Sequence, residues 1–139
     1  AARPEYKAFS GTAVYTTTIN KVPVADVINL DLGSVAENAS VYLNGDYIGT
    51  VIDSPYQLYI PAEKFKGQDE LVVRVANSMA NRIAYMDKKG VDWKIFYNVN
   101  MSARKKENVK NGIFDASDWE PKSSGLLGPV TLTPAMVKQ

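Results

Sequence analysis

The chain has 139 residues, of which 45% are hydrophobic, and this is enough for one globular domain with its own core. It contains no cysteine and no histidine, which excludes disulfides, thiolate metal sites and every catalytic arrangement built on those residues. A hydrolytic site would need carboxylates, lysine or tyrosine. The net charge of +1 predicts no nucleic-acid partner, and we expect no membrane span and no signal peptide.

Two strands are predicted at the start of the chain. Residues 9–19 are rich in β-branched and aromatic types, which favour strands. Residues 24–32 alternate between apolar and polar side chains, which is the period of a strand with one buried face. In the second strand the side chains expected inward are Ile28, Leu30 and Leu32, and those expected outward are Asn29 and Asp31.

A β-hairpin is predicted over residues 38–49. Asn44-Gly45 is the residue pair that best tolerates the two positive φ angles of a type I′ turn. A two-residue turn there would place Val41 opposite Ile48 and Tyr42 opposite Tyr47. The face expected in the core is Val41, Leu43 and Ile48.

Further short strands are predicted over residues 56–60, 69–77 and 130–133, and a single helical turn over 61–65. In the strand over 69–77, the inward side chains are Leu71, Val73 and Val75. Short strands with turn signals between them and almost no helical periodicity predict an all-β fold. The simplest arrangement is an antiparallel β-sandwich of the jelly-roll type.

One long insertion, about residues 78–127, separates the last strand from the others, and segments of this length are usually functional or ordered by a partner. Within it we expect a short helix over residues 80–86 and a strand over 93–99. Residues 104–111 are polar and predict a solvated loop.

Several stretches together resemble a known module. Residues 30–33 (LDLG), 41–45 (VYLNG) and 71–77 (LVVRVAN), with Gly49 and Pro55-Tyr56, resemble the galactose-binding-like jelly roll of glycoside hydrolase family 2 and its relatives. Residues 80–83 (ANRI) and 124–130 (SGLLGPV) resemble the accessory domain of family 106 α-L-rhamnosidases of Bacteroidetes. The resemblance covers nearly the whole chain, but the aromatic stretch 86–120 departs from it.

The resemblance implies a role that is not catalytic, because such enzymes carry their acid and base carboxylates on a separate barrel domain. It implies that residues 1–139 form a single β-sandwich domain, excised from a larger glycoside hydrolase. The implied partners are the catalytic domain of the same parent chain and an oligo- or polysaccharide. It also implies a secreted, periplasmic or cell-surface location. We expect no cofactor.

Sugar contact is predicted for the aromatic residues of the insertion, because the flat C–H faces of sugars stack on aromatic rings. The candidates are Trp93, Tyr97 and Trp119, with Asn81 and Arg82 as donors to sugar hydroxyls or to a carboxylated sugar. The alternatives are that the rings hold the loop on the sandwich and that Asn81 and Arg82 satisfy loop carbonyls. An autonomous carbohydrate-binding module therefore competes with a structural accessory domain.

Two clusters rich in acidic residues and one basic run are less specific indications of a functional site. Asp115, Asp118 and Glu120 could serve as a carboxylate pair, a calcium site or, as we expect, a solvated loop or helix cap. Asp26, Asn29 and Asp31 could bind calcium, but their alternation already explains them as outward strand residues, so no metal is predicted. The basic run 104–106 resembles a nucleic-acid groove only superficially, since the sequence pI is about 8.1.

Overall fold

A computed structural model of the chain describes residues 7–94 and 105–136. The chain divides into two compact units. The sandwich unit consists of Gly11–Asn77 together with Ser124–Gln139, and the insertion unit consists of Ala1–Ser10 together with Ser78–Ser123. In the described part of the chain, no helix is both long and apolar enough to cross a membrane.

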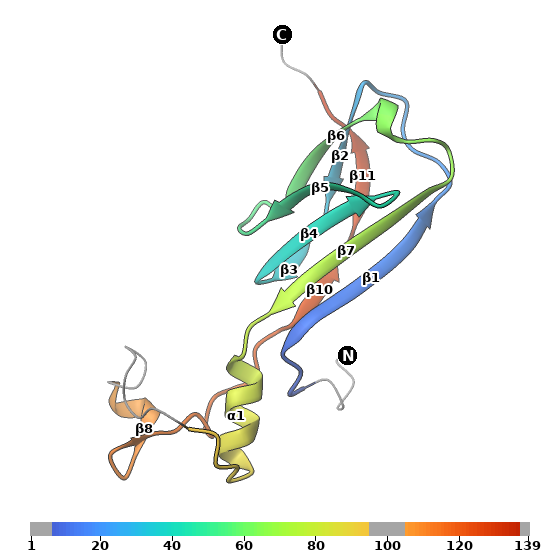
Figure 1. The fold of residues 1–139 in the computed structure, drawn as a ribbon. Coiled ribbons are helices and arrows are strands. Elements are labelled where there is room, and N and C mark those ends of the chain that lie inside the picture. Colours follow the sequence, from blue (N-terminus) through green and yellow to red (C-terminus); the bar gives the residue numbers. More distant parts are fainter. Residues whose placement is uncertain (1–6, 95–104, 137–139) are drawn as a thin grey trace. The chain divides into compact units, whose positions relative to one another are not determined.

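The first sheet of the sandwich unit has four antiparallel strands (Figure 1). Their order is β1 (Gly11–Ile19), β7 (Asp69–Asn77), β4 (Asn38–Leu43) and β5 (Asp46–Val51). The strand predicted over 9–19 therefore begins two residues later than expected, and the strand predicted over 69–77 is confirmed. β1 is an edge strand, which explains why most of its side chains are exposed.

The second sheet contains β11 (Thr131–Pro134), β2 (Val27–Asp31) and β6 (Gln57–Pro61), and a further pair is formed by β10 (Gly125–Gly128) and β3 (Ser34–Ala36). β2 runs on into β3, and β10 runs on into β11, so the two pairs continue one another along the chain (Figure 1). The break in each lies at Gly33 and Gly128, which form a bridge. The sequence did not predict β3 or β10, because both are short and rich in small residues.

The core lies between the two sheets, and alternation predicts its members well. Ile28, Leu30 and Leu32 are buried from the second sheet, as are Leu71, Val73 and Val75 from the first. The predicted helical turn is the 3₁₀ helix η2 (Ala62–Lys64). The all-β antiparallel sandwich predicted from the sequence is confirmed.

The hairpin β4–β5 turns at the predicted pair. Asn44 and Gly45 have φ angles of 51° and 84°, as a type I′ turn requires. Tyr42 lies opposite Tyr47 as predicted, but the expected pairing of Val41 with Ile48 is wrong, because Val41 lies opposite Gly49. A β-bulge adds one residue to β5 and so shifts the pairing of the two strands by one residue. The residues of the turn do not predict this shift.

The turn of this hairpin is bonded to the start of β7 through two side chains. The amide nitrogen of Asn44 donates to Asp69 Oδ1 at 2.7 Å, and Asn44 Oδ1 accepts the backbone N–H of Glu70 at 2.9 Å. The buried carboxylate of Asp69 also accepts the backbone N–H groups of Lys66 and Gly67. Burial alone would raise the pKa of Asp69, but these hydrogen bonds outweigh it and hold the pKa below its ordinary value.

The described part of the insertion unit contains one α-helix, α1 (Ala80–Lys88), which confirms the helix predicted over 80–86. It also contains the 3₁₀ helix η4 (Lys106–Asn108) and the short hairpin β8 (Val109–Lys110) to β9 (Ile113–Phe114). In its described part, the segment predicted as a solvated loop over 104–111 is mostly exposed, but it forms η4 and β8, and Asn108 is buried. Trp93 and Lys94 are not in a strand, and the rest of the strand predicted over 93–99 lies outside the described residues.

Candidate functional site

A groove of about 630 Å³ lies in the insertion unit. One wall is a face of α1, where Asn81, Ala84, Tyr85 and Lys88 recur at the spacing of one side of a helix. The segment 117–121, which includes Trp119, supplies further lining. The groove therefore combines aromatic surface with amide and charged groups, as sites for small polar ligands do.

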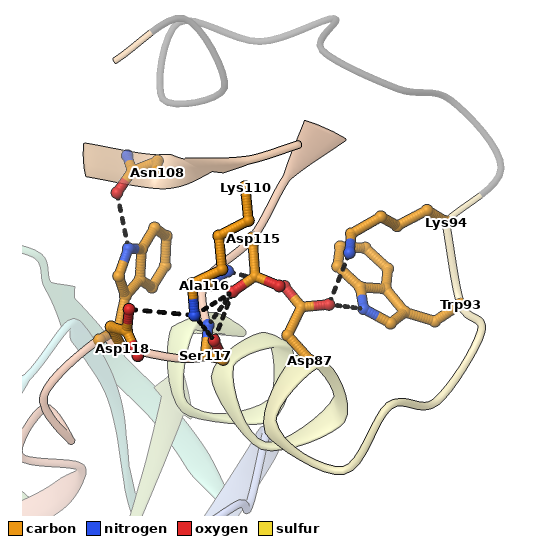
Figure 2. Close-up of polar contacts among 10 residues, drawn as sticks. Asp87, Trp93, Lys94, Asn108, Lys110, Asp115, Ala116, Ser117 and Asp118 are labelled. Atoms are coloured by element: carbon orange, nitrogen blue, oxygen red, sulfur yellow. Dashed lines mark hydrogen bonds and ion pairs between the residues drawn. The ribbon is translucent and has the colours of Figure 1, made fainter. Parts of the chain in front are cut away.

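Asp87, near the end of α1, lines this groove and makes polar contacts with residues that follow the helix (Figure 2). Its side chain is only 1% exposed. One oxygen accepts the indole N–H of Trp93 and the ammonium of Lys94, both at 2.7 Å, and the other accepts the backbone N–H of Ala116 at 2.8 Å. A buried carboxylate with this many donors is a structural anchor, since every bond that it makes joins α1 to a later segment.

A small apolar cluster packs beside this anchor. Phe114 and Ala116 are buried, and Trp93, Trp119, Ile83 and Ala84 pack against them. The ring of Trp119 meets that of Phe114 edge to face, with 5.7 Å between centroids. Its indole N–H donates to Asn108 Oδ1 at 2.8 Å. Both tryptophans of the insertion thus help to form its core, although Trp119 also lines the groove.

The acidic run 115–120 is built into a turn. Asp115 accepts hydrogen bonds from the backbone N–H and the hydroxyl of Ser117, which lower the pKa of Asp115, with a further contribution from Lys110. Lys110 pairs with Asp118 at 3.0 Å and with Asp115 at 3.5 Å, and these carboxylates raise the pKa of Lys110. Asp115 therefore stabilises a turn. This role is similar to the loop or cap role that the sequence led us to expect.

The groove does not offer the carboxylate pair that glycoside hydrolysis needs. Three acidic residues line it, but Asp87 is saturated with donors and Asp118 is paired with Lys110. Glu120 alone of the three has no ion pair with another described residue. Within residues 7–94 and 105–136, no cluster of three or more acidic side chains could hold a metal ion.

Only some of the residues predicted to contact sugar line the groove. Trp119 and Asn81 line the groove, whereas Trp93 and the exposed Arg82 do not. The amide of Asn81 exchanges two hydrogen bonds of 2.8 Å with the backbone of Lys122, which is the alternative role considered from the sequence. Tyr97 lies outside the described residues. Sugar contact by this set stays a prediction.

Sequence reasoning missed several residues that define this region. Tyr85 and Lys88 follow Asn81 by four and seven residues. Residues with this spacing lie on one face of a helix, so the signal was present in the sequence. The β8–β9 hairpin turns at Asn111-Gly112, with φ angles of 51° and 78°. This is the same turn signal as Asn44-Gly45, and it was present in the sequence. Asp87 had no sequence signal, because its partners are up to 29 residues away.

Two comparisons identify what the chain is similar to, although no family model matches it. A protein of Formosa agariphila named as a β-glucuronidase is 35% identical over 141 residues, covering 91% of this chain. The structure of a rhamnosidase from Novosphingobium sp. PP1Y is 31% identical with a TM-score of 0.72, covering 95% of this chain. The chain spans only about 12% of the length of each. It therefore corresponds to a small accessory domain of glycoside hydrolases and not to a catalytic domain.

Proposed function

We propose that this chain is the accessory β-sandwich domain of a secreted, periplasmic or cell-surface glycoside hydrolase related to α-L-rhamnosidases, and that it packs on the catalytic domain of the same parent protein. The observation that carries the proposal is the match of nearly the whole chain to about 12% of a rhamnosidase structure. Such hydrolases are often extracellular, and the absence of cysteine is compatible with that location. Residues 1–139 would then act as one accessory domain.

The outer face of the sheet β1-β7-β4-β5 is the surface that suits such packing. Tyr42 and Tyr47 meet edge to face with centroids 5.6 Å apart, and the guanidinium of Arg74 lies 5.3 Å from the Tyr42 ring. Tyr47 is 60% exposed, and Val14, which pairs with Arg74 across the strands, is 57% exposed. Tyrosine and arginine are enriched at protein interfaces, which supports this face as the contact with the catalytic domain.

The test compares the longer hydrolase with and without residues 1–139, and then mixes the shortened enzyme with the 139-residue chain. We expect the chain alone to turn over no aryl glycoside and to bind the shortened enzyme in calorimetry. Tyr47→Ala should weaken that binding about tenfold, since it removes an interface aromatic worth about 1–2 kcal/mol.

Tyr59→Ala is the matched control, because Tyr59 is 63% exposed on β6 of the other sheet and should leave binding unchanged. The proposal is wrong if the chain does not bind the shortened enzyme and its removal leaves the stability and activity of the longer enzyme unaltered. Equal losses in Tyr47→Ala and Tyr59→Ala would reject the chosen face.

A second candidate function is glycan contact, in which the domain holds part of the substrate for the catalytic domain or acts as an autonomous carbohydrate-binding module. The observation that favours it is the groove, which is lined by the aromatic rings of Trp119 and Tyr85 and by the charged side chain of Lys88. Aromatic rings beside polar or charged groups are a combination that suits sugars.

A further inference from the structure

The groove has the size and the surface for one or a few sugar units. Its volume of about 630 Å³ falls within the roughly 300–1,000 Å³ of ordinary small-molecule sites. Tyr85 is 44% exposed and lines the groove from α1, so its ring is available for stacking. Trp119 supplies a second aromatic surface, although part of its ring packs on Phe114.

On the α1 side of the groove, the charge that remains available is positive. Of its acidic residues, Asp87 is taken up by internal donors, whereas the exposed Asp118 shares Lys110 with Asp115 and so keeps part of its charge, as Glu120 does. Of its basic residues, neither Lys7 nor Lys88 has an ion pair within the described part of the chain. Among the described residues, the ammonium of Lys88 on the α1 side of the groove has no ion pair, so it favours a ligand with negative charge next to it.

Tyr85 and Lys88 are neighbours on the helix surface, because residues three apart on a helix lie about 5–6 Å from each other at their Cβ atoms. A pyranose ring stacked on Tyr85 would therefore bring one of its substituents within reach of the ammonium of Lys88. The flexible stem of lysine lets the charge follow the substituent without a fixed geometry.

We propose that the groove between α1 and residues 117–121 binds a sugar unit with an anionic substituent, a carboxylate or a sulfate ester, which stacks on Tyr85 and pairs with Lys88. This inference rests on the glycan-contact function proposed above and names its ligand class. Lys88 is the residue that sets the preference for charge, and Tyr85 is the residue that binds the ring.

The test uses three ligands that differ only at C6: methyl β-D-glucopyranoside, its uronate and its 6-sulfate. Each is titrated into the 139-residue chain while backbone amide signals are followed by NMR, which detects millimolar binding. We expect the uronate, the sulfate or both to bind about three- to tenfold more tightly than the neutral sugar, and this preference should weaken with added salt. The tighter of the two identifies the natural substituent.

Lys88→Gln should remove the preference for the charged ligands, so that their affinity falls to that of the neutral glucoside. Lys89→Gln is the matched control, because Lys89 is exposed next to it but does not line the groove. Tyr85→Ala and Tyr85→Leu should abolish binding of all three ligands, with the amide spectrum showing that each variant is folded.

Equal binding of the three ligands, or a preference that survives Lys88→Gln, would overturn the proposed ligand class. No binding of any ligand to the folded chain would overturn the groove as a sugar site. Neither result bears on packing against the catalytic domain, which the mixing experiment tests separately.

Discussion

Gly33 shows how one residue determines the geometry of the second sheet. It lies where β2 passes into β3, with a φ of 67°. A Cβ added there would lie 2.5 Å from the backbone of Gly128 and 2.6 Å from the carbonyl oxygen of Pro129. We predict that Gly33→Ala lowers the free energy of unfolding by about 2–5 kcal/mol, the sum of left-handed strain and forced overlap. Urea unfolding monitored by circular dichroism measures the loss.

Gly45→Ala separates the two contributions, because Gly45 also has a positive φ of 84° but nothing within 4 Å of an added Cβ. It should cost only the conformational strain, about 1–2 kcal/mol. Equal losses in the two variants would mean that the strands shift to make room at Gly33, and that the contact with Gly128 does not constrain the sheet.

At the scale of elements, Asp69 joins the hairpin β4–β5 to the start of β7, and this bond should depend on pH. Hydrogen bonds hold its pKa below the ordinary value, so the folded state binds fewer protons than the unfolded state near that value. The stabilisation is therefore complete above about pH 4, where the unfolded carboxyl is ionised, and is lost as the pH falls through the lower folded pKa. We predict that Asp69→Asn costs about 1–3 kcal/mol at pH 7, because one side-chain oxygen becomes a donor facing a backbone N–H.

The measurement is urea unfolding of both proteins between pH 7 and pH 2.5, in which the difference between them should shrink as the pH falls. Asp46→Asn is the control in the same hairpin, since Asp46 is exposed and should change stability by less than about 0.5 kcal/mol. A difference that stays constant with pH would show that Asp69 stabilises the fold by shape and not by its charge.

The same elements show what the sequence could predict. Alternation identified the buried faces of β2 and β7, because a strand with one face in the core must place every second side chain there. Turn chemistry placed the Asn44-Gly45 turn, but not the bulge in β5, which depends on how Ile48 packs against the core. The sequence did not predict the groove, but two of the predicted sugar-contact residues, Trp119 and Asn81, line it. Asp87 and Asn108 take their roles from partners distant in sequence, so no local pattern could identify them.

At the scale of the whole molecule, the two units have separate cores, one built from strands of the sandwich and one built around Phe114 and Ala116. The insertion leaves and re-enters the sandwich at one place, because Asn77 Oδ1 accepts the backbone N–H of Gly125 at 2.6 Å. A short linker can therefore span the gap. We predict that replacing residues 78–123 with a Gly-Ser linker of about three residues leaves a folded sandwich, since shortening a loop reduces the entropy lost on folding.

The shortened chain should keep a strand-rich circular dichroism spectrum and a single cooperative unfolding transition, and it should bind none of the three sugars. Its matched control is Asn77→Ala in the shortened chain, which removes the bond to Gly125 and should cost about 1 kcal/mol. A shortened chain that is soluble but unfolds without cooperativity would contradict the prediction. In that event the sandwich depends on the insertion for its stability, and residues 1–139 fold as one inseparable domain. A cooperative transition would instead make the insertion an independent addition to the jelly roll, with the proposed ligand site in the added part.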